Sequence, residues 1–301
     1  MADLFYWVLN MSILGSLLGL GLLALRRIRR LPRWVCYGLW AIVGLRLWLP
    51  VGLSWKWSLM NLLDGLMVKT VYLPVRGLDL AFSNSIQAVN GYFPMTYRTN
   101  LLENLFATAG LIWAAVAAVA VLTLAFFYIL THLQLPPLTH IRGRVYRSGK
   151  AEGPMVLGIF RPKIILPEES APFDNPYVLR HEETHIRRLD NLWRLTALAS
   201  CCLHWFNPLM WVFLRAFLSD MELSCDETVL KTFGESHKKE YALILVRCRE
   251  SRTVYSAALG GAGIRARVER ILNYRQLTTA SGVALGLFVI LCAVTLLTNG
   301  G

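Results

Sequence analysis

The chain has 301 residues, of which 55% are hydrophobic and only 17% are charged. This composition excludes an ordinary soluble domain and is typical of an integral membrane protein. The formal net charge of +12 does not require a nucleic-acid partner, because basic cytoplasmic loops and attraction to anionic lipids give membrane proteins the same excess. We therefore expect the lipid bilayer as a partner and no direct nucleic-acid binding.

Four segments are long and apolar enough to cross a bilayer, which takes about 20 residues. In chain order they are residues 4–25, 34–53, 105–130 and 278–297. The first lacks the basic start and the small-residue cleavage site of a signal peptide, so we expect it to be retained. The sequence thus predicts a membrane domain over residues 1–130, with a loop at 51–104, and a fourth span within 278–301.

The connection between the first two spans sets the expected orientation. It contains five positive charges and no acid, namely Arg26, Arg27, Arg29, Arg30 and Arg33. Short cytoplasmic connections are enriched in Lys and Arg. We therefore expect a multi-pass protein whose N-terminus and residues 51–104 lie outside, and whose residues 131–277 form a cytoplasmic domain.

Short strands are expected at the start of this cytoplasmic domain. Residues 144–148, 155–160 and 163–166 follow the helix-breaking Pro136–Pro137 pair and have the composition of strands. Arg161–Pro162 separates the last two, which predicts a hairpin. A helix should then run from Pro176 to about Asp190.

That helix contains His181-Glu182-Glu183-Thr184-His185. Histidines four residues apart project from one helical face, so both imidazoles can bind one zinc ion, and Glu182 can act as general base toward the water on that ion. The pattern predicts a zinc metalloprotease with one catalytic ion. Arg187, Arg188, Asp190 and Asn191 follow, and we expect them to be ordinary surface charges or caps.

An edge strand beside such a site can pair with an extended substrate. We therefore expect residues 155–160 to contact substrate; a purely structural hairpin is the alternative. The strand comprises Met155, Val156, Leu157, Gly158, Ile159 and Phe160.

Further on, Asn207–Pro208 divides the apolar residues 195–218 into halves too short to span, which predicts a membrane-associated helical hairpin with His204 as a core residue.

Catalytic zinc usually has three protein ligands, and Glu222 is the best candidate for the third. Asp226 lies one helical turn later on the same face, where it can accept a hydrogen bond from a ligand histidine. Cys225 points in another direction and is a weaker candidate. Glu227 is expected to be a solvated charge.

These features together resemble the BlaR/MecR antirepressor family of bacterial membrane metallopeptidases. The resemblance covers nearly the whole chain and rests on the spans, the His-Glu-x-x-His segment between spans three and four, the Asn-Pro break and Glu-Leu-Ser-Cys-Asp-Glu at 222–227. It implies a mainly α integral membrane protein of the bacterial cell membrane, with a zincin-like α+β protease domain. It also implies zinc at His181, His185 and Glu222, with Glu182 as catalytic base.

By the same resemblance, the expected substrate is a cytoplasmic transcriptional repressor, whose loss would switch on a resistance or stress operon, and self-cleavage is expected near the site. The best-known members sense beta-lactams through a penicillin-binding domain after the last span. This sequence ends at Gly301, so we expect the signal to enter through residues 51–104, a separate sensor protein or the membrane. A second copy of the chain is another candidate partner.

Two other functions fit the sequence. One is a quality-control or prenyl-protein zinc protease, which would differ in its range of substrates. The other is a non-catalytic scaffold that transduces signals across the membrane, which would lack turnover.

Overall fold

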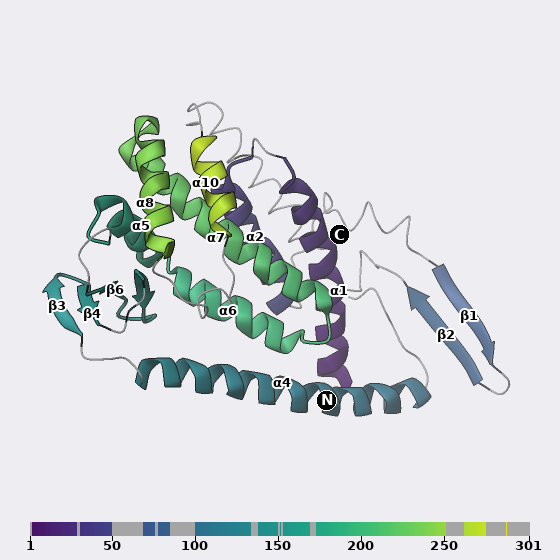
Figure 1. Ribbon diagram of the computed structural model, residues 1–301. Helices are drawn as coiled ribbons and strands as arrows, with labels where there is room; N and C mark the ends of the chain where they lie inside the picture. Colours follow the sequence, from purple (N-terminus) through teal and green to yellow (C-terminus); the bar gives the residue numbers. More distant parts are fainter. Residues whose placement is uncertain are drawn as a thin grey trace.

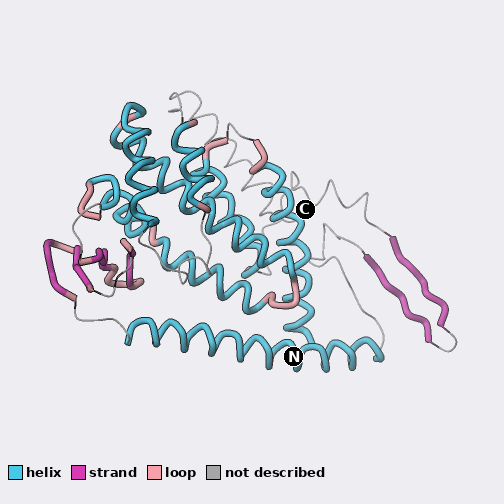
Figure 2. The backbone as a smooth tube through the Cα atoms, in the orientation of Figure 1, coloured by secondary structure: helices cyan, strands magenta, loops and turns pink. Residues whose placement is uncertain are grey.

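The computed structural model describes residues 2–28, 31–49, 69–75, 78–84, 100–133, 138–149, 151, 153–168, 173–250, 262–274 and 287 (Figure 1). It is mainly helical. Figure 2 shows that its strands fall into a two-stranded hairpin and one small sheet. The predicted fourth span, 278–297, lies almost entirely outside the described residues, as does most of the loop at 51–104.

Two described helices are long and apolar enough to cross a membrane. They are α1 (Ala2–Leu25) and α4 (Asn100–Leu133), whose apolar segments are Leu4–Leu25 and Leu105–Leu130. The apolar side chains along α4 are largely exposed, among them Leu111, Leu122 and Phe126. An exposed apolar helix surface of this length fits contact with lipid chains. Both segments were predicted as spans.

The second predicted span differs in length. Its helix, α2 (Arg33–Trp48), has 16 residues, and Leu49 after it is extended. One face of α2 is buried against α1 and α7 (Pro208–Phe233), where it forms the largest apolar core. Arg46 is 2% exposed, so its side chain is buried inside the protein.

The predicted break at Asn207–Pro208 is present. Asn207 ends the connection after α6 (Asp190–Leu203) and caps α7, because its side chain accepts a hydrogen bond from the Leu209 amide. It also donates to Ser12 and Ser16 of α1. The second arm does not stop near residue 218: nothing interrupts the helix until Gly234, whose φ is +94°. The apolar arm and the segment containing Glu222 are therefore one helix.

The small sheet has four strands in the order β3-β4-β6-β5. They are β3 (Thr139–Arg142), β4 (Val145–Ser148), β5 (Met155–Leu157) and β6 (Lys163–Pro167). β4 and β6 are parallel, and the other neighbours are antiparallel, so the predicted β5–β6 hairpin is confirmed. The sequence did not predict β3, nor the separate hairpin of β1 (Lys69–Val75) and β2 (Leu78–Asn84).

The helix with the two histidines, α5 (Pro176–Arg187), begins after Asn175, whose side chain accepts a hydrogen bond from the Tyr177 amide. It ends earlier than predicted, because Leu189 adopts a left-handed conformation with φ +56°. This turn reverses the chain and starts α6 at Asp190. α5 lies against β5, α6 and α7, and the site forms between these helices.

Two further helices close this side of the molecule. α8 (Lys238–Glu250), which follows the short turn η1 (Glu235–His237), packs against α10 (Ile264–Leu272), and α10 packs against α7. Their apolar faces form a second core together with Tyr177 and Val178 of α5. These helices therefore pack beside α5 and α7, between which the site forms.

Candidate metal centre

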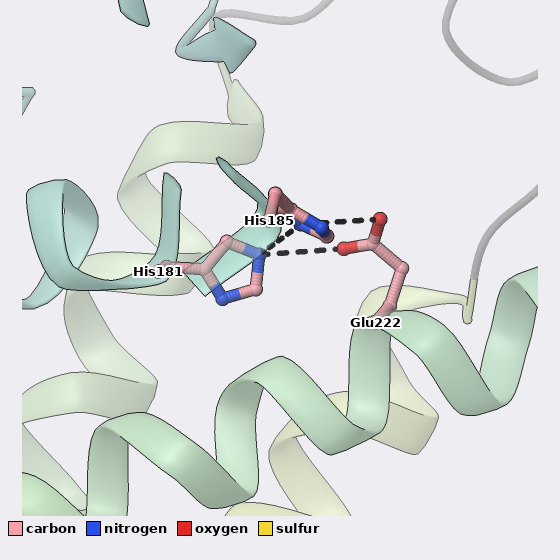
Figure 3. A group of neighbouring side chains, drawn as sticks. All are labelled: His181, His185 and Glu222. Carbon is pink, nitrogen blue, oxygen red and sulfur yellow. Dashed lines mark hydrogen bonds and ion pairs between the residues drawn. The ribbon is translucent and has the colours of Figure 1, made fainter. Parts of the chain in front are cut away.

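The structure brings the three predicted ligands together (Figure 3). His181 and His185 project from one face of α5, and Glu222 faces them from α7. The two Nε2 atoms are 3.2 Å apart, and the Glu222 carboxylate oxygens lie 3.4 Å from His181 Nε2 and 3.7 Å from His185 Nε2. Tetrahedral ligands at about 2.1 Å from one ion lie about 3.4 Å apart. The spacing and the His2Glu donor set therefore fit a catalytic zinc site.

Glu182, the predicted general base, lies on the same helix and is largely buried. Among the residues that the structure describes, no ion pair joins its carboxylate to another side chain. A carboxylate without a competing cation keeps its lone pairs available for a water proton.

Asp226 lies behind His181. Its Oδ1 is 3.2 Å from His181 Nδ1, which is the nitrogen away from Glu222, as a carboxylate that orients a ligand imidazole requires. Tyr241 of α8 donates to the same oxygen at 2.6 Å and lies 3.2 Å from His181 Nδ1. Burial raises the pKa of Asp226, but the Arg267 guanidinium outweighs it and holds that pKa at about 2. Asp226 is therefore a buried anion.

Asp190 lies behind His185 as Asp226 lies behind His181, so the prediction that Asp190 is an ordinary surface charge or cap was wrong. Its carboxylate is completely buried and lies 2.6 Å from His185 Nδ1. It also accepts hydrogen bonds from Tyr37 at 2.7 Å and from Arg188 at 2.8 Å. The left-handed turn at Leu189 brings Asp190 back toward α5, and sequence spacing gives no sign of that turn. Each ligand histidine thus has its own carboxylate.

Arg188 is also a structural residue and not a free surface charge. It donates to Ser224 Oγ at 2.7 Å, and its guanidinium lies 4.4 Å from the centre of the Tyr37 ring. It therefore joins α5, α7 and α2 around Asp190. Arg187, in contrast, is exposed, as predicted.

Asn191 connects the site to the sheet. Its side-chain amide donates to the carbonyls of Val156 at 3.0 Å and Gly158 at 3.1 Å. β5 is an edge strand, but it is shorter than predicted because Gly158, with φ +93°, begins the turn. Phe160 in that turn is 96% exposed. Substrate contact by residues 155–160 stays a prediction.

Two arginines contact Glu222. Arg194 of α6 donates to Oε1 at 2.7 Å, and Arg267 of α10 lies 3.6 Å from Oε2. Burial raises the pKa of Glu222, but the neighbouring histidines and both guanidinium groups hold it well below its usual range. The predicted third ligand is therefore ionised, as metal binding needs.

Cys225 belongs to a second group that can hold a metal ion, formed with His185 and Asp190. That group uses His185 Nδ1, which is already bonded to Asp190. Burial raises the pKa of the Cys225 thiol well above its usual range, whereas a zinc ligand must be a thiolate. The site of His181, His185 and Glu222 is the better metal site.

The prediction for Glu227 was wrong as well. It is 5% exposed and accepts hydrogen bonds from the backbone amides of Arg33 and Trp34 at the start of α2. Asp220, two residues before Glu222, is buried against Arg26 at 2.7 Å and Trp40 at 2.9 Å. α7 therefore presents two acids to the metal site and two to the α1–α2 connection, because residues 220 and 227 lie on another face than 222 and 226.

His204 is a buried core residue, as predicted, and lies 3.3 Å from the Leu47 carbonyl of α2.

Comparison of the sequence with known proteins identifies the family of this chain. The chain is similar to the regulatory protein BlaR1 of Bacillus licheniformis, with 29% identity over 139 residues, which cover 43% of this chain and 23% of that relative. It is also similar to the methicillin resistance mecR1 protein of Staphylococcus aureus, with 25% identity over 161 residues, which cover 50% of this chain and 28% of the relative. The mecR1 protein of Staphylococcus epidermidis matches to the same extent.

The matched part is thus well under half the length of each relative. These similarities confirm the resemblance to the BlaR/MecR family, whose members are membrane-associated metallopeptidases. A family model described as BlaR1 peptidase M56 matches residues 6–271, so this chain belongs to the BlaR1 peptidase M56 family.

Proposed function

We propose that the protein is a membrane-bound zinc endopeptidase that cleaves a cytoplasmic transcriptional repressor. The observation that carries this proposal is the spacing of 3.2, 3.4 and 3.7 Å among the facing atoms of His181, His185 and Glu222. Three ligands at tetrahedral spacing leave one coordination position for water or substrate, which is the arrangement of a catalytic and not a structural zinc site.

The residues around the ion have separate tasks. His181, His185 and Glu222 would hold it, and Asp226 and Asp190 fix which nitrogen of each imidazole faces it. A bound zinc ion acts as a Lewis acid toward the scissile carbonyl and lowers the pKa of its water. Glu182 accepts the proton of the attacking water and returns it to the leaving amine.

An extended substrate would lie along β5. Asn191 fixes that strand relative to the site by binding the carbonyls of Val156 and Gly158, which face away from β6. In an antiparallel strand the amide and carbonyl of one residue point to the same side. The Val156 amide thus points to the same side as the carbonyl that Asn191 binds, and we propose that it pairs with substrate backbone, which would give binding with little dependence on side chains.

The repressor as substrate follows from the relatives, which are named as a regulatory protein and as methicillin resistance proteins. We propose the same kind of signalling here, with the protease domain in the cytoplasm, the N-terminus outside and self-cleavage near the site. A separate sensor protein and a second copy of the chain belong to the same proposal.

The test is cleavage of a purified repressor encoded beside this gene. Full-length protein in nanodiscs with zinc should cut it, and the Glu182→Gln variant should lose at least about 10³-fold in rate, because it loses its proton acceptor and keeps its metal ligands. Undiminished cleavage by Glu182→Gln would refute the assignment. Cutting of many damaged or prenylated membrane proteins, with the repressor left intact, would favour the quality-control alternative instead.

A further inference from the structure

Arg267 lies closer to the metal site than its distance in the sequence suggests. It comes from α10, lies 86 residues after His181 in the sequence and is 9% exposed. Nε and Nη2 donate to the two Asp226 oxygens at 2.8 and 2.6 Å. Nη2 also lies 3.4 Å from His181 Nε2, and Nη1 lies 3.6 Å from Glu222 Oε2.

These last two contacts involve the atoms that would bind the ion. In the deprotonated imidazole that binds a metal, the Nε2 lone pair of His181 can accept a hydrogen bond from a guanidinium or bind the ion, but it cannot do both fully. The same choice applies to Glu222 Oε2. A fixed positive charge this near a buried site also repels a divalent ion.

Arg267 also weakens the hydrogen bond between the Asp226 carboxylate and His181 Nδ1. The imidazole is a better metal ligand when Asp226 accepts strongly from Nδ1. Two donors from Arg267 and one from Tyr241 share the Asp226 carboxylate with that imidazole. All three effects of the guanidinium on metal affinity have the same sign.

We propose that Arg267 is a positioning residue that competes with the metal ion for His181 and Glu222. The docking of α10 against α7 thereby limits zinc affinity and holds the metal-free site together by compensating its buried acids. This inference rests on the proposed function, since it assigns a role toward the same ion.

The docking of α10 does not depend on Arg267 alone. Ile271 is 1% exposed in the core shared with Leu230 and Tyr241. Arg270 donates to Glu227 at 3.1 Å and to the Leu31 carbonyl at 2.6 Å. A variant at 267 should therefore keep α10 in place, and Arg270→Gln is a matched control that weakens docking without touching a metal ligand.

The experiment measures zinc affinity by competition with a chromophoric chelator. It uses the full-length protein in detergent, with Glu182→Gln present throughout to prevent self-cleavage. Loss of residues that merely support ligands typically weakens metal binding by about 10–100-fold. We expect the opposite for Arg267→Gln, a Kd about tenfold lower, with no change for Arg270→Gln. An unchanged or higher Kd in Arg267→Gln would overturn the inference.

Arg267→Lys gives a second test if the Gln variant does not fold. One ammonium group can bind Asp226 but cannot also reach Glu222 and His181, so its Kd should fall by a smaller factor, and an unchanged or raised Kd contradicts the inference. The two proposals fail in different ways. If the parent protein binds no zinc, the proposed function fails; if it binds zinc and Arg267 variants do not bind it more tightly, only this inference fails.

Discussion

Replacement of Asp190 by Asn tests whether the carboxylate behind His185 sustains the metal site. The variant keeps the shape of the side chain and removes its charge. The Asp190 carboxylate accepts hydrogen bonds from His185, Arg188 and Tyr37 at 2.6 to 2.8 Å. Burial raises the pKa of Asp190, but His185 and Arg188 outweigh this effect and hold the pKa at about 2. An amide at this position offers a donor to His185 Nδ1, which favours the tautomer with its proton on Nε2, the atom that should bind zinc.

The magnitude follows from these contacts. Breaking a buried ion pair costs about 3–5 kcal/mol. Arg188 keeps Ser224 and the Met221 carbonyl as partners and is partly exposed, so we expect a loss of unfolding free energy near the low end, about 3 kcal/mol. Zinc affinity should fall by about 10–100-fold, as for other groups that orient a metal ligand.

The assay combines thermal unfolding of the metal-free protein with chelator competition for zinc. Arg187→Gln is the control, because Arg187 lies in the same turn and is exposed; it should change stability by less than about 0.5 kcal/mol. Zinc affinity in Asp190→Asn equal to that of the parent would refute the role assigned to Asp190.

Three further outcomes are expected. Glu227→Gln should lower the unfolding free energy by about 1–3 kcal/mol in a denaturation experiment, because the Arg33 and Trp34 amides and Arg270 lose their anion; an unchanged midpoint would contradict this. Asn191→Ala should raise the KM for the repressor about tenfold while zinc affinity stays the same, since β5 loses its anchor; a loss of zinc instead would place Asn191 in the metal site. Zinc affinity should also depend on pH. Burial lowers the pKa of His181, but the hydrogen bonds with Asp226 and Glu222 outweigh the effect of burial and raise the pKa to about 9. Below this value the ion must displace a proton, so chelator titrations should show affinity rising about tenfold per unit as pH increases toward 9, and a flat profile would contradict it.

Local spacing along a helix was enough to predict that His181 and His185 share one helical face and that Glu222 and Asp226 share another, which the structure confirms. His181 and His185, like Glu222 and Asp226, are four residues apart, and such pairs share a helical face wherever the helix lies. The break at Asn207 and the β5–β6 hairpin were predictable for a similar reason, because a proline or a turn acts on its own neighbours.

The residues that sequence reasoning missed are placed by tertiary structure. Asp190 depends on a left-handed turn at Leu189, a residue type that seldom adopts that conformation. Arg267 and Tyr241 reach the site from helices far along the chain. The sequence around Glu227 predicts a solvated charge because nothing local indicates that α7 packs on the start of α2.

The most direct test of a zinc peptidase is metal content measured together with cleavage in the same purified samples. We predict one zinc per chain and cleavage in the parent protein, one zinc without cleavage in Glu182→Gln, and neither in Glu222→Gln. Cleavage that survives in Glu222→Gln with its zinc lost, or a parent protein that cleaves the repressor without any bound metal, would contradict the account.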